Sequence, residues 1–134
     1  LPPLVAVAIL VLAGAPEGAI RAFCFVTAVG AGLACVEWGA AWERQRGASD
    51  PKEVVADEYA GQALALGYAA YPADPGACLL GLAVLFGLFR GFDILKPPPV
   101  NLVQRASGGW GILLDDVLAG VAAVAVFHAA RWLF

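Results

Sequence analysis

The apolar run from Ala22 to Trp42 constrains the fold of this chain more than any other feature. It is 21 residues long and holds a single charged residue, Glu37. A helix of about 20 apolar residues is long enough to cross the hydrocarbon core of a bilayer. Trp38 and Trp42 suit a membrane interface, where tryptophan is enriched. The mean hydropathy of +0.79 also favours the membrane class of protein.

The remaining residues predict further helices, because the chain shows no strand alternation and no fixed-period repeat. Proline and glycine interrupt the apolar runs, and Asp50-Pro51-Lys52-Glu53 has the residues of a helix N-terminus with a capping box. The expected order is a short apolar helix end within 4–15, the crossing 22–42, a polar loop 43–50, a helix from 50 to about 71, a turn 71–76, a helix 77–92 stopped by Lys96 and three prolines, a polar loop to 109, and a last helix 111–134.

These elements predict an all-α fold, a polytopic bundle of membrane helices. At 134 residues the chain is one domain, 1–134. Because it starts without Met inside an apolar run, we read it as truncated at its N-terminus. The cysteines, Cys24, Cys35 and Cys78, lie in apolar segments without CxxC spacing, which indicates small buried side chains and no disulfide. The net charge of −3 and the lack of a basic stripe exclude nucleic acid as a partner.

Five acidic residues stand beside apolar runs in a chain of which only 14% is charged. Burying a carboxylate costs several kcal/mol, as an order of magnitude, unless a cation compensates it. We therefore expect a divalent cation at these acids, and a phosphate group as the ligand that needs the cation. Hard oxygen donors favour Mg²⁺ or Mn²⁺ over softer metals. The five acids are Asp57, Glu58, Asp93, Asp115 and Asp116.

The basic residues predict an orientation in the membrane. If the segments cross alternately, six basic residues fall on one side and two, Arg21 and Arg131, fall on the other. The positive-inside rule makes the richer side cytoplasmic. All three acidic motifs lie near helix ends on that side, so we expect them to converge on one site at the cytoplasmic membrane face. The six are Arg44, Arg46, Lys52, Arg90, Lys96 and Arg105.

The first acidic motif, V-V-A-D-E-Y-A-G, lies on the helix expected from residue 50. Asp57 and Gly61 are four residues apart and share a helix face, whereas Glu58 is turned about 100° away. Gly61 would let a neighbouring helix approach closely, as small residues do in membrane packing. The alternative interpretation, a solvated helix end without a function, is equally open for this motif alone.

The second motif, F-R-G-F-D-I-L-K-P-P-P, repeats a charge every third residue. Arg90, Asp93 and Lys96 therefore share one helix face. A surface ladder of ion pairs would stabilise little. The functional interpretation is a phosphate clamp beside a metal ligand, in which Arg90 grips phosphate with two donors and Lys96 acts as a point charge.

The third motif, G-G-W-G-I-L-L-D-D-V-L-A-G, places a glycine-rich segment before a helix. Backbone N–H groups of Gly108 and Gly109 at a helix N-terminus would favour an anion, although this pattern alone is weak evidence. Asp115 and Asp116 are adjacent and precede an apolar run, so each raises the pKa of the other unless a cation holds both.

Two further titratable residues receive weaker predictions. His128 lies about 20 Å along the last helix from Asp115, and we expect a structural or interfacial role for it. Glu37 lies within the apolar run, where joining the metal site and facing water are equally open.

Together the three motifs resemble the phosphatidylglycerophosphatase A family, over about Val54 to Gly120 and in the family's order and spacing. The resemblance implies a bacterial inner-membrane phosphoric monoester hydrolase with several membrane passes. Such an enzyme removes the terminal phosphate of phosphatidylglycerophosphate with Mg²⁺ to give phosphatidylglycerol, in glycerophospholipid biosynthesis. It places the family's acids on the five named above and its basic positions on Arg90 and Lys96. The family's usual N-terminal segment with Gly, Pro and Thr has no match here.

The expected mechanism uses one or two metal ions held by the carboxylates, with water attacking phosphorus in line. A covalent aspartyl-phosphate on Asp93 or Asp115 remains an alternative, which trapping of labelled phosphate on the protein would reveal. Three other functions stay open at this point: a cation or proton transporter that uses the acids, a structural subunit whose acids only pair with Arg90 and Lys96, and a lipid phosphotransferase.

Overall fold

The computed structural model describes residues 2–46, 56–98 and 109–133. In these residues every regular element is a helix, so the predicted all-α class is confirmed. The helices are α1 (Pro2–Leu12), α2 (Glu17–Arg46), α3 (Ala56–Gly67), α4 (Pro75–Leu95) and α6 (Gly109–Leu133).

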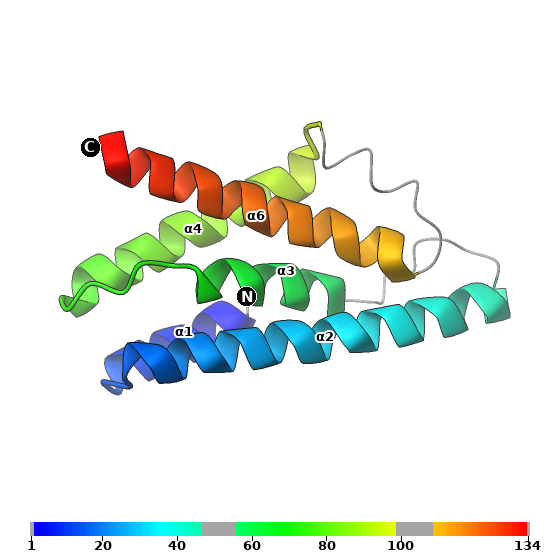
Figure 1. Ribbon diagram of the computed structural model, residues 1–134, viewed down its shortest axis with the longest axis horizontal. Coiled ribbons are helices and arrows are strands. Elements are labelled where there is room, and N and C mark those ends of the chain that lie inside the picture. Colours follow the sequence, from blue (N-terminus) through cyan, green and yellow to red (C-terminus); the bar gives the residue numbers. More distant parts are fainter. Residues whose placement is uncertain (1, 47–55, 99–108, 134) are drawn as a thin grey trace.

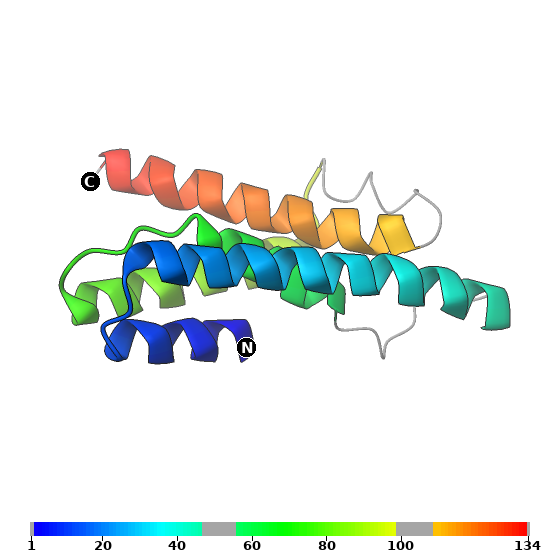
Figure 2. The same cartoon turned by 60° about the horizontal axis from the view of Figure 1, so that its bottom comes forward.

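The helices form an elongated bundle around α3 (Figure 1). The short α3 packs against α1, α2, α4 and α6, and α4 also packs against α6. Figure 2 shows α1 running beside the first half of α2, with the chain reversing between them. Gly14 has φ +71 in this reversal, a backbone conformation that glycine adopts at little cost. The C-termini of α2 and α4 and the N-termini of α3 and α6 lie at the same end of the bundle (Figure 1).

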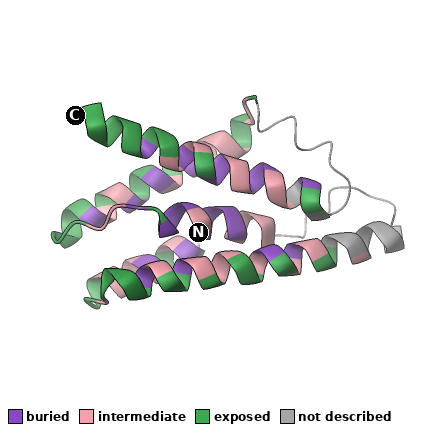
Figure 3. Cartoon of the chain, in the orientation of Figure 1, coloured by how far each residue is buried: buried purple, intermediate pink, exposed green. Residues whose placement is uncertain are grey.

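Within the described ranges, three helices are long and apolar enough to cross a membrane, which bears out the predicted membrane bundle. The candidate spans are Glu17–Trp38, Pro75–Leu95 and Leu113–Leu133. Large apolar side chains on these helices point outward, including Val26, which is 73% exposed, and Leu80, which is 67% exposed. The exposed and half-buried outer surfaces in Figure 3 are thus suited to lipid chains, which are as apolar as the side chains themselves.

The centre of the bundle is built where α3 meets α4 and α6 (Figure 3). Leu66, Leu82, Leu85 and Phe89 are almost fully buried there, together with alanines of α3 and α6. All three cysteines are buried and unbridged, as predicted. Lipid chains are as apolar as these side chains, so the hydrophobic effect does not drive membrane helices together. Small residues instead let the helix backbones approach closely and pack.

Gly61 is the point of closest approach between α3 and α6. A Cβ atom added to Gly61 would lie 2.8 Å from the carbonyl carbon of Asp116 and 3.0 Å from the Phe89 ring. A Cβ atom added to Gly120 would lie 2.7 Å from the carbonyl oxygen of Gly61. The predicted close approach at Gly61 is therefore confirmed, and its partner is the helix that carries Asp115 and Asp116.

Several predicted boundaries were wrong by a few residues. The loop expected from residue 43 starts later, because α2 continues through Glu43 to Arg46, all good helix formers. The helix expected to reach Tyr71 ends at Gly67, because side chains bind the carbonyl groups at that point. The predicted helix start at residues 50–53 lies outside the described residues.

The boundaries of α4 also extend beyond those predicted, and its caps explain both ends. The Asp74 carboxylate accepts a hydrogen bond of 2.6 Å from the Ala77 N–H, and Pro75 suits the first helical turn. At the other end Lys96 takes a left-handed conformation, φ 43, and its N–H donates to the Phe92 carbonyl. The prolines then stop the helix, as expected, but at Leu95 and not at Phe92.

Substitution of Gly61 tests the close contact between α3 and α6. Gly61→Ala should lower the free energy of unfolding by about 1–3 kcal/mol, because the added methyl group meets backbone atoms that cannot rotate away. Thermal unfolding in detergent, followed by circular dichroism, measures the effect. Gly87→Ala in α4 is the matched control, since a Cβ there meets nothing within 4 Å. Equal melting temperatures for the two variants would contradict the contact.

Candidate metal and phosphate site

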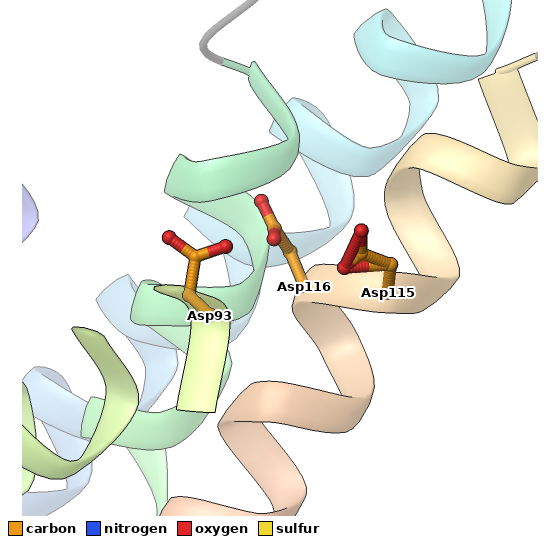
Figure 4. A group of neighbouring side chains, drawn as sticks. All are labelled: Asp93, Asp115 and Asp116. Atoms are coloured by element: carbon orange, nitrogen blue, oxygen red, sulfur yellow. The ribbon is translucent and has the colours of Figure 1, made fainter. Parts of the chain in front are cut away.

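Three aspartates from two helices form the centre of the candidate site. Asp93 comes from the last turn of α4, and Asp115 and Asp116 come from α6 (Figure 4). One carboxylate oxygen from each lies within 4.8 Å of the others. Asp115 and Asp116 are buried, at 5% and 4% exposure, whereas Asp93 is partly exposed. The predicted convergence of the second and third motifs is therefore present in the fold.

Asp57 joins this cluster from α3. Its carboxyl group lies within hydrogen-bonding reach of Asp116, and the charges of Asp93 and Asp115 act on it. Burial raises the pKa of Asp57 to about 6; hydrogen bonds lower it, and the charges of Asp93 and Asp115 raise it. The acid cluster thus resists a further negative charge, and a bound cation would relieve this repulsion.

Glu58 and Arg90 form an ion pair between α3 and α4. The same Nη1 atom of Arg90 lies 2.8 Å from Oδ2 of Asp93, so the guanidinium bridges the first and second motifs. The Glu58 and Arg90 side chains are 37% and 36% exposed, so these contacts lie at the mouth of the cluster. Glu58 therefore pairs with the Arg90 guanidinium. Among the described residues it is not part of the group of three aspartates.

Lys96 pairs across to α6 and not along its own helix. Its Nζ atom lies 2.5 Å from Oδ2 of Asp115. Burial lowers the pKa of Lys96, but the hydrogen bond and charge of Asp115 outweigh burial, with help from Asp93 and Asp116, so the pKa lies above its usual value. Lys96 therefore stays protonated. Its left-handed backbone turns the side chain back toward the acids after α4 has ended.

The donor set fits a hard divalent cation. Carboxylate oxygens are the ligands that Mg²⁺ and Mn²⁺ prefer, and three of them here lie close enough to share one ion. Five carboxylates and two basic side chains meet in this region, so negative charge remains in excess. The acids would hold the metal, and Arg90 and Lys96 lie beside it, where an anionic group could also be bound.

Comparison with known proteins identifies the family of the chain. The model of the phosphatidylglycerophosphatase A family matches residues 2–131. The chain belongs to this family. No solved structure matches it significantly.

Three bacterial proteins match between 62% and 64% of the chain. A putative phosphatidylinositol-3-phosphatase of Bacteroides thetaiotaomicron is 41% identical over 83 residues, covering 62% of this chain and 50% of the relative. The phosphatidylglycerophosphatase A of Haemophilus influenzae is 37% identical over 87 residues, covering 64% and 50%. That of Escherichia coli is 31% identical over 86 residues, covering 63% and 47%. The matched part thus spans about half the length of these relatives.

The other predicted residues have mixed outcomes in this family member. Gly109 is the first residue of α6, and Gly108 lies outside the described residues. Glu37 is exposed on α2 and does not belong to the aspartate cluster of the described residues. His128 is far from the cluster, and its Nε2 atom lies 2.9 Å from the Tyr68 carbonyl oxygen, which fits the structural role expected for it.

Two buried residues lie near the site where the sequence analysis did not place them. Cys35 of α2 is fully buried and interacts electrostatically with Asp57 and Asp116. Gln62 follows Glu58 by one helical turn and is 2% exposed, and its Oε1 atom accepts no hydrogen bond from the described residues. The available signal for Gln62 was an amide within residues 60–67, which are otherwise Ala, Gly and Leu. No sequence signal placed Cys35 near the acids, because Asp57 and Asp116 come from two other helices.

Removing one aspartate should weaken metal binding without unfolding the bundle. We expect Asp93→Asn to weaken Mn²⁺ binding at least about tenfold, because it removes one of three clustered charged donors. Electron paramagnetic resonance of free Mn²⁺, in detergent, measures the affinity. Asp74→Asn is the matched control: it lies at the opposite end of the same helix, and asparagine also serves as an N-cap. Unchanged affinity in Asp93→Asn would exclude Asp93 as a ligand.

Proposed function

We propose that this protein hydrolyses phosphatidylglycerophosphate to phosphatidylglycerol and phosphate, as a Mg²⁺- or Mn²⁺-dependent phosphoric monoester hydrolase of glycerophospholipid biosynthesis. One observation carries the proposal. Three aspartates that could hold a metal ion lie within 4.8 Å of one another, and the two basic residues of the family motifs pair with the same acidic region. Family membership supports the substrate.

The proposed chemistry divides the residues by charge. A bound divalent cation supplies Lewis-acid stabilisation of phosphoryl oxygens and a lowered pKa for water. Asp93, Asp115 and Asp116 hold that cation, with Asp57 beside them. Arg90 and Lys96 neutralise the remaining charge of the phosphate and stabilise the charge that develops in the transition state. The backbone N–H of Gly109, with that of Gly108, is proposed as a further anion contact.

The depth of the cluster suits a lipid substrate. Asp93 lies two residues before the end of one candidate span, and Asp115 lies two residues after the start of another. The acids are therefore near the boundary between lipid and water. A phosphate headgroup could reach them while its acyl chains stay in the bilayer, so no separate lipid-binding domain is required.

We also propose that the cluster faces the cytoplasm of a bacterial inner membrane. Arg44, Arg46, Arg90 and Lys96 belong to the end of the bundle where α2 and α4 finish, whereas Arg21 and Arg131 belong to the other end. The excess of basic residues at the acidic end supports a cytoplasmic position by the positive-inside rule. A multi-pass protein in this orientation would meet its substrate in the inner leaflet.

The alternative of a cation or proton transporter receives no support. A relay across the membrane needs polar groups at successive depths. The described acid cluster instead lies near one end of the spans, together with basic side chains. Cation flux into proteoliposomes that requires Asp115 would revive this alternative.

Phosphate release from purified full-length protein tests the proposed function. With Mg²⁺, phosphatidylglycerophosphate in mixed micelles should yield phosphate, and EDTA should abolish the release. Asp115→Asn should lower the rate at least about 100-fold, because it removes charge where the metal and Lys96 are held. Asp74→Asn, at the far end of α4, should keep full activity.

The outcomes of this assay separate chemistry from substrate. Release from other phosphomonoesters, but none from phosphatidylglycerophosphate, would keep the metal chemistry and discard the proposed lipid. No release from any phosphomonoester by folded protein would overturn the enzyme function altogether.

Labelling of introduced cysteines tests the orientation. Trp110 begins α6 and is 57% exposed, and Trp132 ends it and is 92% exposed. In intact spheroplasts an impermeant maleimide should label Trp132→Cys, and it should label Trp110→Cys only after permeabilisation. The native cysteines are buried and give little background. The reverse pattern would place the acid cluster outside the cytoplasm.

A further inference from the structure

The end of α3 that is remote from the acids is held by side chains from three parts of the chain. A helix leaves its last carbonyl groups without intrahelical partners, and lipid cannot supply donors for them. Here successive carbonyls at and after this end meet side-chain groups. The pairs are Tyr71 hydroxyl to Leu66 oxygen at 2.7 Å, Arg21 Nη1 to Gly67 oxygen at 2.5 Å, His128 Nε2 and Tyr68 oxygen at 2.9 Å, and Arg21 Nη2 to Ala69 oxygen at 3.0 Å.

Arg21 makes two of these four contacts and is itself fixed in place. Its Nε atom donates to Glu17 of the same helix at 2.8 Å, and its guanidinium carbon lies 5.4 Å from the centre of the Tyr71 ring. A planar guanidinium can bond two carbonyl oxygens at once, which a lysine ammonium does with less geometric definition. Arg21 therefore ties the C-terminal end of α3 to α2 through a rigid fork.

The contact between α3 and α6 sets how close the two helices lie, but it does not by itself fix the axial position of α3. The contact at Gly61 and Gly120 has no side chain that interlocks along the helix axis. At the acidic end of α3 the ion pair between Glu58 and Arg90 links it to α4. At the opposite end the Arg21 fork links it to α2.

Asp57 lies ten residues before Gly67 on the same short helix, about 15 Å away. An axial shift at Gly67 would therefore move Asp57 relative to Asp116.

We propose that Arg21 is a positioning residue that fixes the axial position of α3 and thereby holds Asp57 at the aspartate cluster. Arg21 does not touch the site and acts only through the helix that it anchors. This inference rests on the proposed function, because it assumes that the cluster binds a divalent cation. It explains why a basic residue stands inside the first candidate span, Glu17–Trp38, at the end of the bundle opposite the acids.

A double-mutant cycle on Mn²⁺ affinity tests the proposal in the full-length protein in detergent. Arg21→Gln should weaken Mn²⁺ binding about threefold or more, and Arg21→Lys should weaken it less. In the presence of Asp57→Asn the same Arg21→Gln change should have little further effect, because the group that it positions is already gone. Arg131→Gln is the matched control, an exposed basic residue at the same end of the bundle, and it should leave the affinity unchanged.

The cycle separates positioning from a purely structural role. A structural role would lower the melting temperature while the folded protein kept its Mn²⁺ affinity, or it would weaken binding equally with and without Asp57→Asn; either result overturns the proposal. If Arg21→Gln does not fold, Arg21→Lys takes its place in the same cycle and decides the matter, because it keeps the charge but removes the fork that bonds Gly67 and Ala69. No Mn²⁺ binding by the unaltered protein would instead overturn the metal site itself.

Discussion

The backbone of α3 lies directly against the backbone of α6, and the rest of the site depends on this contact. Gly61 meets the carbonyl group of Asp116, and Gly120 meets the carbonyl oxygen of Gly61. Any side chain at either glycine would push the helices apart. Because Asp57 stands one turn before Gly61 on α3, the same contact that packs the helices also brings Asp57 to Asp116. The close contact between α3 and α6 thus produces both the helix packing and the clustering of the acids.

Electrostatics explains how so many acids are tolerated at the end of an apolar bundle. Arg90 bridges Glu58 and Asp93, and Lys96 pairs with Asp115, so the basic side chains partly neutralise acids from all three helices. The compensation is incomplete, and the raised pKa of Asp57 reflects burial together with the remaining negative charge. A cluster of this kind is costly without a cation and well suited to one, which links the fold to the proposed phosphatase chemistry.

Much of the fold could be predicted from local patterns. The apolar run of α2, the cap at Asp74 and the prolines after Lys96 act within a few residues, so their helices were expected, although the boundaries shifted. The end of α3 was misplaced by four residues because Arg21 and His128, distant in sequence, bind the carbonyl groups there. Contacts of that kind leave no periodic signal, since each depends on a different helix being in place.

For the candidate site, the sequence by itself determined which residues are present and that they lie near the same end of the bundle. Helix periodicity can be read from neighbouring residues, and the side of the membrane follows from counting the crossings. The tertiary structure alone decided the pairing. It grouped Asp93 with Asp115 and Asp116, directed Lys96 across to Asp115, and turned Glu58 toward Arg90. The physical reason is that partner choice depends on the separation and rotation of neighbouring helices, which the contact at Gly61 and Gly120 sets through space and not along the chain.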